Sequence, residues 1–443
     1  MKTYYAREAL LPSGWARDVR ITVDDGAISA VEPGDAAKGA ERLQGPVLPG
    51  MANLHSHAFQ RAMAGLTDVR AAAHDDFWSW RELMYQFMER LTPEQAQAIA
   101  AQLYIEMLQH GYTAVAEFHY VHHPAEMLDR HLAAARETGI AITLLPSLYR
   151  WSGFGAKPLE PRQRRFASDV RSVLDIVARV RRTVSADVNV GVAPHSLRAV
   201  DPESLKELVN ALDGDTPIHI HAAEQMREVE ECTLALHKRP VEWLLENCPV
   251  DGRWCLVHAT HMQPGELIAL AASGAVAGLC PSTEADLGDG IFPLVGYRGA
   301  SGRWGIGGDS HVSRDPAEEL RLLEYVQRLV GRRRNISVSS TSAAVGTTLW
   351  LEAAAGGAQA LGREMGALAP GKRADLVVLD GEHPDLAPRT GDAIANALIF
   401  SGSQDLVRDV MVAGRWLVRE RQHAQQNAAA KHYARAVAEL IRV

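Results

Sequence analysis

The chain has 443 residues, of which 47% are hydrophobic, so it can bury a large core and is expected to form one large domain with a smaller one, or two to three domains. Its formal net charge of −8, without a long basic run, argues against nucleic acid as a partner. No apolar run is long enough to span a membrane, and the N-terminus lacks a signal-peptide core, so we expect a soluble, cytoplasmic protein. The four cysteines have no C-x-x-C spacing, so we expect them to be reduced thiols.

Short strand-like runs occupy both ends of the chain. The predicted strands are residues 3–11, 19–23 and 28–31 near the start and 374–379, 397–400 and 407–418 near the end. A sheet this small buries little by itself. We therefore expect residues 1–47 and 366–420 to combine into one small β-sandwich domain, with two unrelated β segments as the alternative. The Ala-rich stretch 421–443 is expected to be a C-terminal helix and a candidate contact in a homodimer.

Between these segments, nearly all-apolar runs alternate with helical patterns. The eight predicted strands are residues 47–57, 113–118, 142–148, 188–195, 217–224, 254–260, 275–282 and 304–311. Thr92-Pro93-Glu94-Gln95 is a capping box that begins a helix, and Asp315-Pro316-Ala317-Glu318 begins another in the same way. Eight β/α units over 48–365 predict an α/β fold with a TIM (β/α)8 barrel. A doubly wound open sheet is the alternative, but no G-x-G-x-x-G turn follows the first strand.

Functional side chains of a TIM barrel gather at the C-terminal ends of its strands. The first predicted strand lies in LPGMANLHSHAFQ, residues 48–60, and ends in His55 and His57, which point to the same side because they are two residues apart. The later strands also end in polar residues, namely His195 and Arg198, then His219, His221 and Glu224, then His258, and finally Asp309. This pattern predicts one functional site at that rim of the barrel.

Nitrogen and carboxylate ligands without a thiolate suit a metal ion. We predict one divalent cation, with Zn²⁺ as the first choice and Fe²⁺ as the alternative. Its predicted ligands are His55, His57, His221 and Asp309, with one position left for water. Any one of these histidines, taken alone, reads better as a hydrogen-bonded core residue. His219 shares a face with His221 but lies deeper along the strand, so we expect it in the core or behind the ligands.

A metal site of this kind predicts hydrolysis. A bound divalent cation lowers the pKa of water, so hydroxide becomes available near neutral pH. Glu224 would accept a proton and pass it to a leaving group, unless it is only a solvated residue at a helix start. His258 and Asp309 would polarise the electrophile or orient the hydroxide. The set predicts hydrolytic attack at an sp² carbon, with ammonia or an amine leaving.

The chain resembles the amidohydrolase superfamily over nearly its whole length. The matching pieces are PGMANLHSH at 49–57, HIHAAE at 219–224, VHAT at 257–260, GIGGDSH at 305–311 and APGKRADLVVLD at 369–380. Two-metal members of the superfamily usually carry a lysine at the end of the fourth strand. Here that strand reads VNVGVAPHS, without a lysine, so the resemblance implies one metal, as in the deaminase branch.

More narrowly, HSHAFQRAMAGL at 55–66 is similar to the branch that hydrolyses N-formimino-L-glutamate to N-formyl-L-glutamate and ammonia in histidine breakdown. The likeness implies a small substrate with two carboxylates, and it implies that the residues holding it are Gln60, Arg81, Tyr120, His195 and Arg198. Arginine suits this task, since its planar fork can grip a carboxylate. For Arg81 alone, a surface salt bridge with Glu82 is the alternative. The reserve arginines are Arg61, Arg150 and Arg314.

Three other functions stay open. A purine or pterin deaminase would use the same metal chemistry, and Phe77, Trp78 and Trp80 offer faces on which a base can stack. An amidase or carbamoyl hydrolase would release an amine. A barrel that has lost catalysis and serves as a binding module would be a different class of protein, but such a barrel usually loses its metal ligands.

Overall fold

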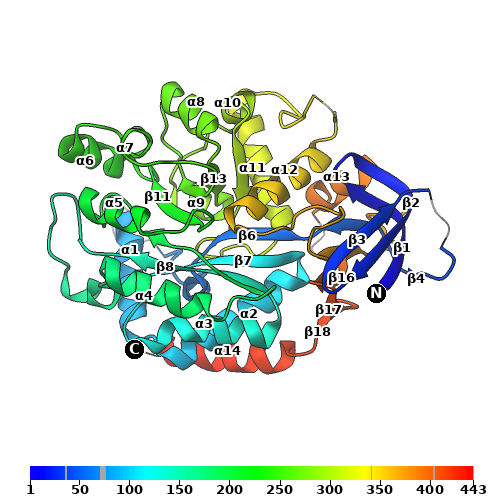
Figure 1. Ribbon diagram of the computed structural model, residues 1–443, viewed down its shortest axis with the longest axis horizontal. Helices are drawn as coiled ribbons and strands as arrows, with labels where there is room; N and C mark the ends of the chain where they lie inside the picture. Colours follow the sequence, from blue (N-terminus) through cyan, green and yellow to red (C-terminus); the bar gives the residue numbers. More distant parts are fainter. Residues whose placement is uncertain (35–36, 70–75, 341, 403–404, 443) are drawn as a thin grey trace.

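The computed structural model describes residues 1–34, 37–69, 76–340, 342–402 and 405–442. It consists of a β/α barrel with a β-sheet domain at one end, formed by both ends of the chain (Figure 1). None of the helices in the described part is long and apolar enough to cross a membrane. The predicted α/β architecture, a barrel with a small β domain built from both termini, is confirmed.

The sheet domain joins the two ends of the chain through one short strand. Its strands are β1 (Lys2–Leu11), β2 (Gly14–Asp24), β3 (Ala27–Glu32), β4 (Glu41–Arg42), β5 (Val47–Pro49), β15 (Leu376–Leu379), β16 (Val407–Val412), β17 (Arg415–Arg419) and β18 (Gln422–His423). Strand β5 lies between β1 and β15, parallel to the first and antiparallel to the second. The sheet also folds over on itself, because the amide of Ala374 donates to the carbonyl of Gly26 at 2.8 Å. Tyr4, Ile21, Leu376 and Met411 are buried in the core that this creates.

Eight parallel segments form the barrel. They are β6 (Met51–Ser56), β7 (Tyr112–His119), β8 (Ala141–Leu148), β9 (Val188–Val190) with β10 (Ala193–Pro194), β11 (Ile218–Ala222), β12 (Trp254–His258), β13 (Val276–Leu279) and β14 (Arg303–Ile306). Two runs of paired strands, β6 to β10 and β11 to β14, meet through parallel bridges. Val192 bridges to Ile218 on one side, and Ser56 bridges to Asp309 on the other. These two contacts close the barrel.

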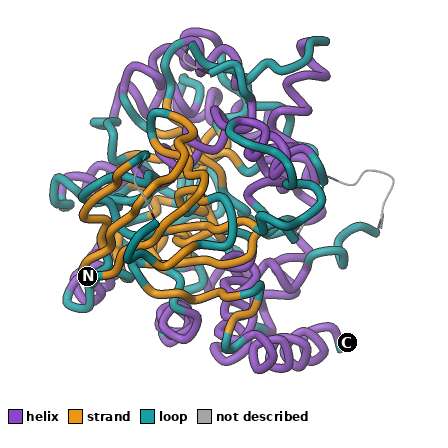
Figure 2. The backbone as a smooth tube through the Cα atoms, turned by 90° about the vertical axis from the view of Figure 1, so that its right-hand side faces the viewer, coloured by secondary structure: helices purple, strands orange, loops and turns teal. Residues whose placement is uncertain are grey.

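Helices surround the barrel, and in Figure 2, which faces the sheet domain, helices lie around the strands. The helices are η1 (Ala58–Met63), α1 (Phe77–Arg90), α2 (Pro93–Gln109), α3 (Glu126–Thr138), η2 (Pro161–Phe166), α4 (Val170–Arg181), α5 (Pro202–Asn210), α6 (Met226–Leu236), α7 (Pro240–Asn247), α8 (Pro264–Ser273), α9 (Pro281–Leu287), α10 (Leu294–Gly299), α11 (Pro316–Gly331), α12 (Val345–Ala360), α13 (Asp392–Phe400) and α14 (Gln426–Ile441). The predicted capping box is confirmed, since Thr92 and Gln95 each accept from the other's backbone amide. Asp315 also caps its helix as predicted.

Some predicted elements are wrong. Residues 397–400 lie in helix α13, because a short apolar run does not distinguish a strand from a buried helix. The predicted strand 47–57 is broken at Gly50, so its first part belongs to the sheet domain and the barrel begins at Met51. A Cβ at Gly50 would lie 2.4 Å from the hydroxyl of Thr113, so the crossing between domains requires glycine. The predicted strand 188–195 consists of two pieces, and 275–282 ends at Leu279 because α9 begins at Pro281.

The C-terminal helix, predicted for 421–443, packs within the chain. Helix α14 lies along α2, where the amide group of Gln95 donates to Glu439 at 3.0 Å and that of Gln109 donates to Gln426 at 2.8 Å (Figure 1). The sheet continues to His423, beyond the predicted domain end at 420. A role of α14 in a homodimer stays a prediction.

Candidate active site

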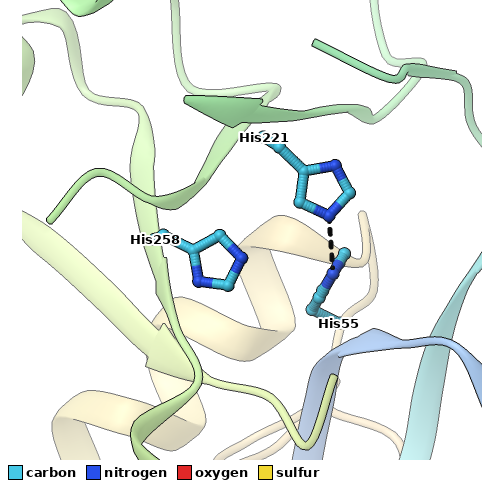
Figure 3. Close-up of side chains that lie close together, drawn as sticks. All are labelled: His55, His221 and His258. Atoms are coloured by element: carbon cyan, nitrogen blue, oxygen red, sulfur yellow. Dashed lines mark hydrogen bonds between the residues drawn. The ribbon is translucent and has the colours of Figure 1, made fainter. Parts of the chain in front are cut away.

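Five side chains that are far apart in sequence meet at the carboxyl rim of the barrel. His55 and His57 come from the end of β6, His221 from β11, His258 from the end of β12, and Asp309 from the loop after β14. Figure 3 shows the imidazoles of His55, His221 and His258 turned toward a common space. The Nε2 atoms of His55 and His221 are 3.1 Å apart. Asp309 Oδ1 lies 3.6 Å from His55 Nε2 and 3.5 Å from His57 Nε2.

The nitrogen atoms of this cluster are arranged to bind a cation. His57 Nδ1 lies 2.8 Å from the carbonyl of Phe118, and His221 Nδ1 lies 2.9 Å from the carbonyl of His195. A carbonyl can only accept, so each Nδ1 carries a proton and each Nε2 lone pair faces the cluster. Burial lowers the pKa of His55, His57 and His221, which keeps these imidazoles neutral. Neutral imidazoles with a carboxylate are a ligand set that zinc or iron(II) accepts.

Asp309 is held in place by the backbone of the first barrel strand. Its amide donates to the carbonyl of His55 at 2.9 Å, and its carbonyl accepts from the amide of His57 at 3.0 Å. The side chain of Asn53 accepts from the amides of His55 and Gly308, at 3.3 and 3.1 Å. These bonds hold Asp309 at φ 48°, a left-handed conformation that is costly for a residue with a Cβ. The barrel closure therefore also positions this carboxylate.

Glu224 and His258 form a buried acid–base pair beside the cluster. His258 Nε2 is 3.6 Å from Glu224 Oε1 and 3.6 Å from Asp309 Oδ2, while its Nδ1 is 3.3 Å from Glu284. Burial alone would lower the pKa of His258, but Glu224, Glu284 and Asp309 raise it well above its usual value. Burial raises the pKa of the Glu224 carboxyl to about 7. A carboxyl with that pKa can take up and release a proton near neutral pH.

All five residues predicted to hold the substrate line one pocket at this rim. They are Gln60, Arg81, Tyr120, His195 and Arg198, and they share the pocket with His57, His221, Glu224 and Asp309. The sequence prediction missed several side chains of the same pocket, namely Met84, Tyr85, Tyr149, Phe166 and Leu287. These are apolar or aromatic residues of helices and loops, and no pattern in the sequence distinguishes them from core residues.

Two arginines bring positive charge into the pocket. The Nε and Nη1 groups of Arg81 and the Nη1 group of Arg198 are buried without a hydrogen-bond partner. Burial, and then the nearby Arg198, lowers the pKa of Arg81. The two guanidinium groups lie over the ring of Trp78, at 4.6 and 5.8 Å from its centroid. Buried, unpaired N–H groups on two adjacent cations are suited to bind an anion.

The structure shows which contacts Arg81 and the three reserve arginines make. Glu82 pairs with Arg162 at 3.2 Å, and Arg81 points into the pocket instead. The three reserve arginines bind elsewhere, Arg61 to the carbonyl of His311, Arg150 to Ser204 and Arg314 to Glu106. His219, expected in the core, is buried and lies 2.8 Å from the carbonyl of Ala360.

Glu117, which the sequence prediction missed, forms hydrogen bonds to the residues on either side of His57. Its carboxylate accepts from the Ser56 hydroxyl at 2.6 Å and from the Ala58 amide at 2.9 Å, the two residues that flank His57. The Tyr104 hydroxyl donates to it at 3.0 Å. Burial raises the pKa of Glu117 to about 7. The sequence signal that could have identified Glu117 is that it is the one carboxylate within the largely apolar run TAVAEFH.

The chain is similar to known proteins over its whole length. The model of the amidohydrolase family matches residues 47–417, and the model described as the N-terminal domain of formimidoylglutamate deiminase HutF matches residues 1–45. The formimidoylglutamate deiminase of Pseudomonas aeruginosa is 52% identical, with all of both chains covered. A 5-methylthioadenosine/S-adenosylhomocysteine deaminase of Natronomonas pharaonis is 28% identical over 96% of this chain and 94% of its own.

Solved structures extend the comparison. The crystal structure of an amidohydrolase from Brucella melitensis, 45% identical, superposes with a TM-score of 0.95 over all of both chains. An adenosine deaminase from Xanthomonas campestris, solved with bound zinc, has a TM-score of 0.83 and covers 100% of this chain and 98% of its own. Its identity is 21%, so it shows the shared fold alone.

Proposed function

The chain belongs to the amidohydrolase family, and on that premise we propose that it hydrolyses N-formimino-L-glutamate to N-formyl-L-glutamate and ammonia in histidine degradation. The observation that carries the proposal is the pair Arg81 and Arg198, whose buried N–H groups have no hydrogen-bond partner in the pocket that adjoins the proposed metal ligands. A substrate with two carboxylates is complementary to this pair. The likeness to the Pseudomonas aeruginosa deiminase supports the same substrate.

Family membership makes the enzyme dependent on a divalent metal. We propose Zn²⁺, with His55, His57, His221 and Asp309 as its ligands, because three neutral imidazoles and a carboxylate fit that ion. When bound, the ion would lower the pKa of a water molecule toward neutrality. Glu117 and Asn53 hold the ligand-bearing backbone in position for it.

The chain's own residues then handle the proton. Water adds to the carbon of the formimino group, and Glu224 accepts a proton from it. Glu224 passes this proton to the terminal nitrogen, which leaves a tetrahedral carbon that bears a hydroxyl and an amino group. Glu224 then takes the hydroxyl proton and passes it to the same nitrogen, the carbon–nitrogen bond breaks, and ammonia leaves as the formyl C=O forms. His258, kept protonated by Glu224, Glu284 and Asp309, donates a hydrogen bond to the oxygen at the reacting carbon.

The remaining pocket residues orient the substrate. Arg81 and Arg198 grip the two carboxylates, while Trp78 holds both guanidinium groups against its ring. The amide group of Gln60 donates to the Tyr120 hydroxyl at 2.8 Å, which fixes two polar groups beside the reacting end. His195 lines the same wall of the pocket. We also propose that the enzyme works in the cytoplasm, in keeping with its four free buried cysteines.

Ammonia release tests the proposal. The metal-loaded protein is incubated with N-formimino-L-glutamate, guanine or adenosine, before and after treatment with a chelator, and after Zn²⁺ is added back. We expect release from N-formimino-L-glutamate alone, lost with the chelator and restored by the ion. Release from a purine but not from N-formimino-L-glutamate would assign the site to the rival class of deaminases.

A further inference from the structure

A second group of buried side chains with metal-binding chemistry lies next to the metal ligands. Glu224 follows β11, His258 ends β12, and Asp289 follows α9. One ligand atom of each lies within 4.8 Å of the others, and Glu224 Oε1 is 3.6 Å from His258 Nε2. Ligands that surround an ion tetrahedrally at about 2.1 Å are about 3.4 Å apart. The separation of Glu224 and His258 is close to that spacing.

Two atoms of this group are buried and without a hydrogen-bond partner. They are His258 Nε2 and Asp289 Oδ2, on side chains that are 0% and 3% exposed. The other oxygen of Asp289 accepts from the side-chain amide of Gln225. The backbone of Asp289 is fixed at both its polar groups, because its amide donates to the backbone carbonyl of Glu284 at 2.9 Å and its carbonyl accepts from the His261 ring at 2.8 Å. Oδ2 is therefore held toward the group rather than placed there by a mobile loop.

The acidic groups around His258 also favour binding of a cation. Carboxylate oxygens of Glu224, Glu284 and Asp309 lie within 3.6 Å of its ring nitrogens, and Asp289 adds a fourth acid to the same buried region. Ionising four acids around one imidazole is costly in a buried site. A divalent cation that replaces the Nε2 proton of His258 and binds the acids would offset that cost.

We propose that Glu224, His258 and Asp289 form a second divalent cation site, of lower affinity than the first, and that its occupation inhibits the enzyme. One imidazole and two carboxylates suit Zn²⁺. The two sets of ligands share no residue, and they approach each other where Asp309 Oδ2 lies 3.6 Å from His258 Nε2. The inhibition rests on the proposed function, since a cation held by Glu224 and His258 takes the proton acceptor and occupies the place of the formimino group.

Zinc titration of the enzyme tests this site. Protein carrying one equivalent of Zn²⁺ is dialysed against rising ZnCl₂, and bound zinc and ammonia release are measured on the same samples. We expect a second equivalent to bind and activity to fall at least tenfold with it, in competition with substrate. Failure of the wild-type protein to bind a second equivalent would overturn the proposal.

Asp289→Asn is the matched variant, because asparagine keeps the acceptor for Gln225 and loses the anionic ligand. We expect it to keep turnover at one equivalent of zinc within about threefold, and to need at least tenfold more Zn²⁺ for inhibition. Asp286→Asn, which removes an exposed carboxylate three residues away, should behave as wild type. An unchanged second equivalent in Asp289→Asn would contradict the assignment.

Anomalous scattering at the zinc edge from crystals soaked in excess ZnCl₂ gives a readout that needs no variant. A peak between Glu224, His258 and Asp289 is expected, and a second peak elsewhere would refute the site. Wild-type protein without activity toward N-formimino-L-glutamate at one equivalent of zinc would refute the proposed function instead, while dialysis and scattering would still report on the second site.

Discussion

His57 and Asp309 are joined twice, once through the backbone and once through their side chains. The amide of His57 donates to the carbonyl of Asp309 at 3.0 Å, and His57 Nε2 lies 3.5 Å from Asp309 Oδ1. The first of these contacts belongs to the seam that closes the barrel between its first and last strands. Barrel closure therefore brings together two of the proposed metal ligands, and stability and metal binding should be coupled.

Metal removal should destabilise the protein as well as inactivate it. A ligand that binds only the folded state stabilises it by an amount that grows with the logarithm of its concentration. We expect a chelator to lower Tm by several degrees and Zn²⁺ to restore it, as measured by thermal unfolding with and without the ion. In Asp309→Asn the ion should shift Tm much less, and a shift equal to that of wild type would remove Asp309 from the ligand set.

Glu224→Gln should retain the metal and lose most turnover, because the amide cannot accept the proton. General acid–base catalysis is commonly worth about 10²- to 10⁴-fold, so we expect kcat to fall in that range. Zinc content by elemental analysis should stay at wild-type level, and Glu230→Gln, an exposed glutamate on α6, should retain full activity. Turnover within a few-fold of wild type would exclude Glu224 as the proton carrier.

Arg198→Ala should impair binding of the substrate without disturbing the metal. Loss of a hydrogen bond to a charged group costs about 1.5–3 kcal/mol, or about 10- to 100-fold in kcat/KM. Arg150→Ala is the control, because Arg150 binds Ser204 and lies outside the pocket. If Arg198→Ala kept kcat/KM within about twofold of wild type, Arg198 would not bind a substrate carboxylate as proposed.

Trp78→Ala should weaken substrate binding by Arg81 and Arg198 indirectly. The guanidinium groups of Arg81 and Arg198 lie over the indole ring, and that of Arg227 lies 4.3 Å from its centroid. Cation–π contacts are worth about 0.5–2 kcal/mol, so we expect KM to rise about tenfold with a smaller change in kcat. Trp151→Ala, which removes an indole bonded to Asp201, should leave KM unchanged. A kcat effect that exceeds the KM effect would point to a different role for Trp78.

Glu117 should make stability depend on pH. Its pKa is raised to about 7 in the folded protein, so between the unfolded value of 4.5 and about 7 only the folded state holds the proton. The stabilisation from this proton is complete below pH 4.5 and is lost by about 1.4 kcal/mol per pH unit as the pH rises to about 7.

The test compares thermal unfolding of wild type and Glu117→Gln from pH 5 to pH 8. The wild-type Tm should fall relative to that of the variant up to about pH 7 and then run parallel to it. Glu126→Gln, an exposed glutamate on α3, should follow wild type throughout. Parallel curves for Glu117→Gln over the whole range would show that Glu117 does not hold a proton in the folded state.

The sequence by itself determined that strands and helices alternate along the chain and which residues lie at the ends of the barrel strands. Period-2 spacing placed His55 and His57 on one side, and parallel strands in a closed barrel bring their carboxyl ends to one rim. The proposed metal ligands and the proposed acid–base pair follow from these two regularities. The boundaries at Gly50 and the helix over 392–400 did not follow, because local patterns do not say which sheet a strand joins or whether a short apolar run is a helix.

Only the tertiary structure decided what surrounds these residues. Arg81 and Arg198 lie on different segments, and their adjacency over Trp78 depends on how α1 packs across the barrel mouth. The bracing of His57 by Glu117 and the position of Asp289 beside Glu224 are likewise contacts between segments. Such contacts have no sequence period, since the chain separation between the partners carries no information about their distance in space. Strand periodicity is a local property of the backbone, whereas the pocket arises from packing of the whole molecule.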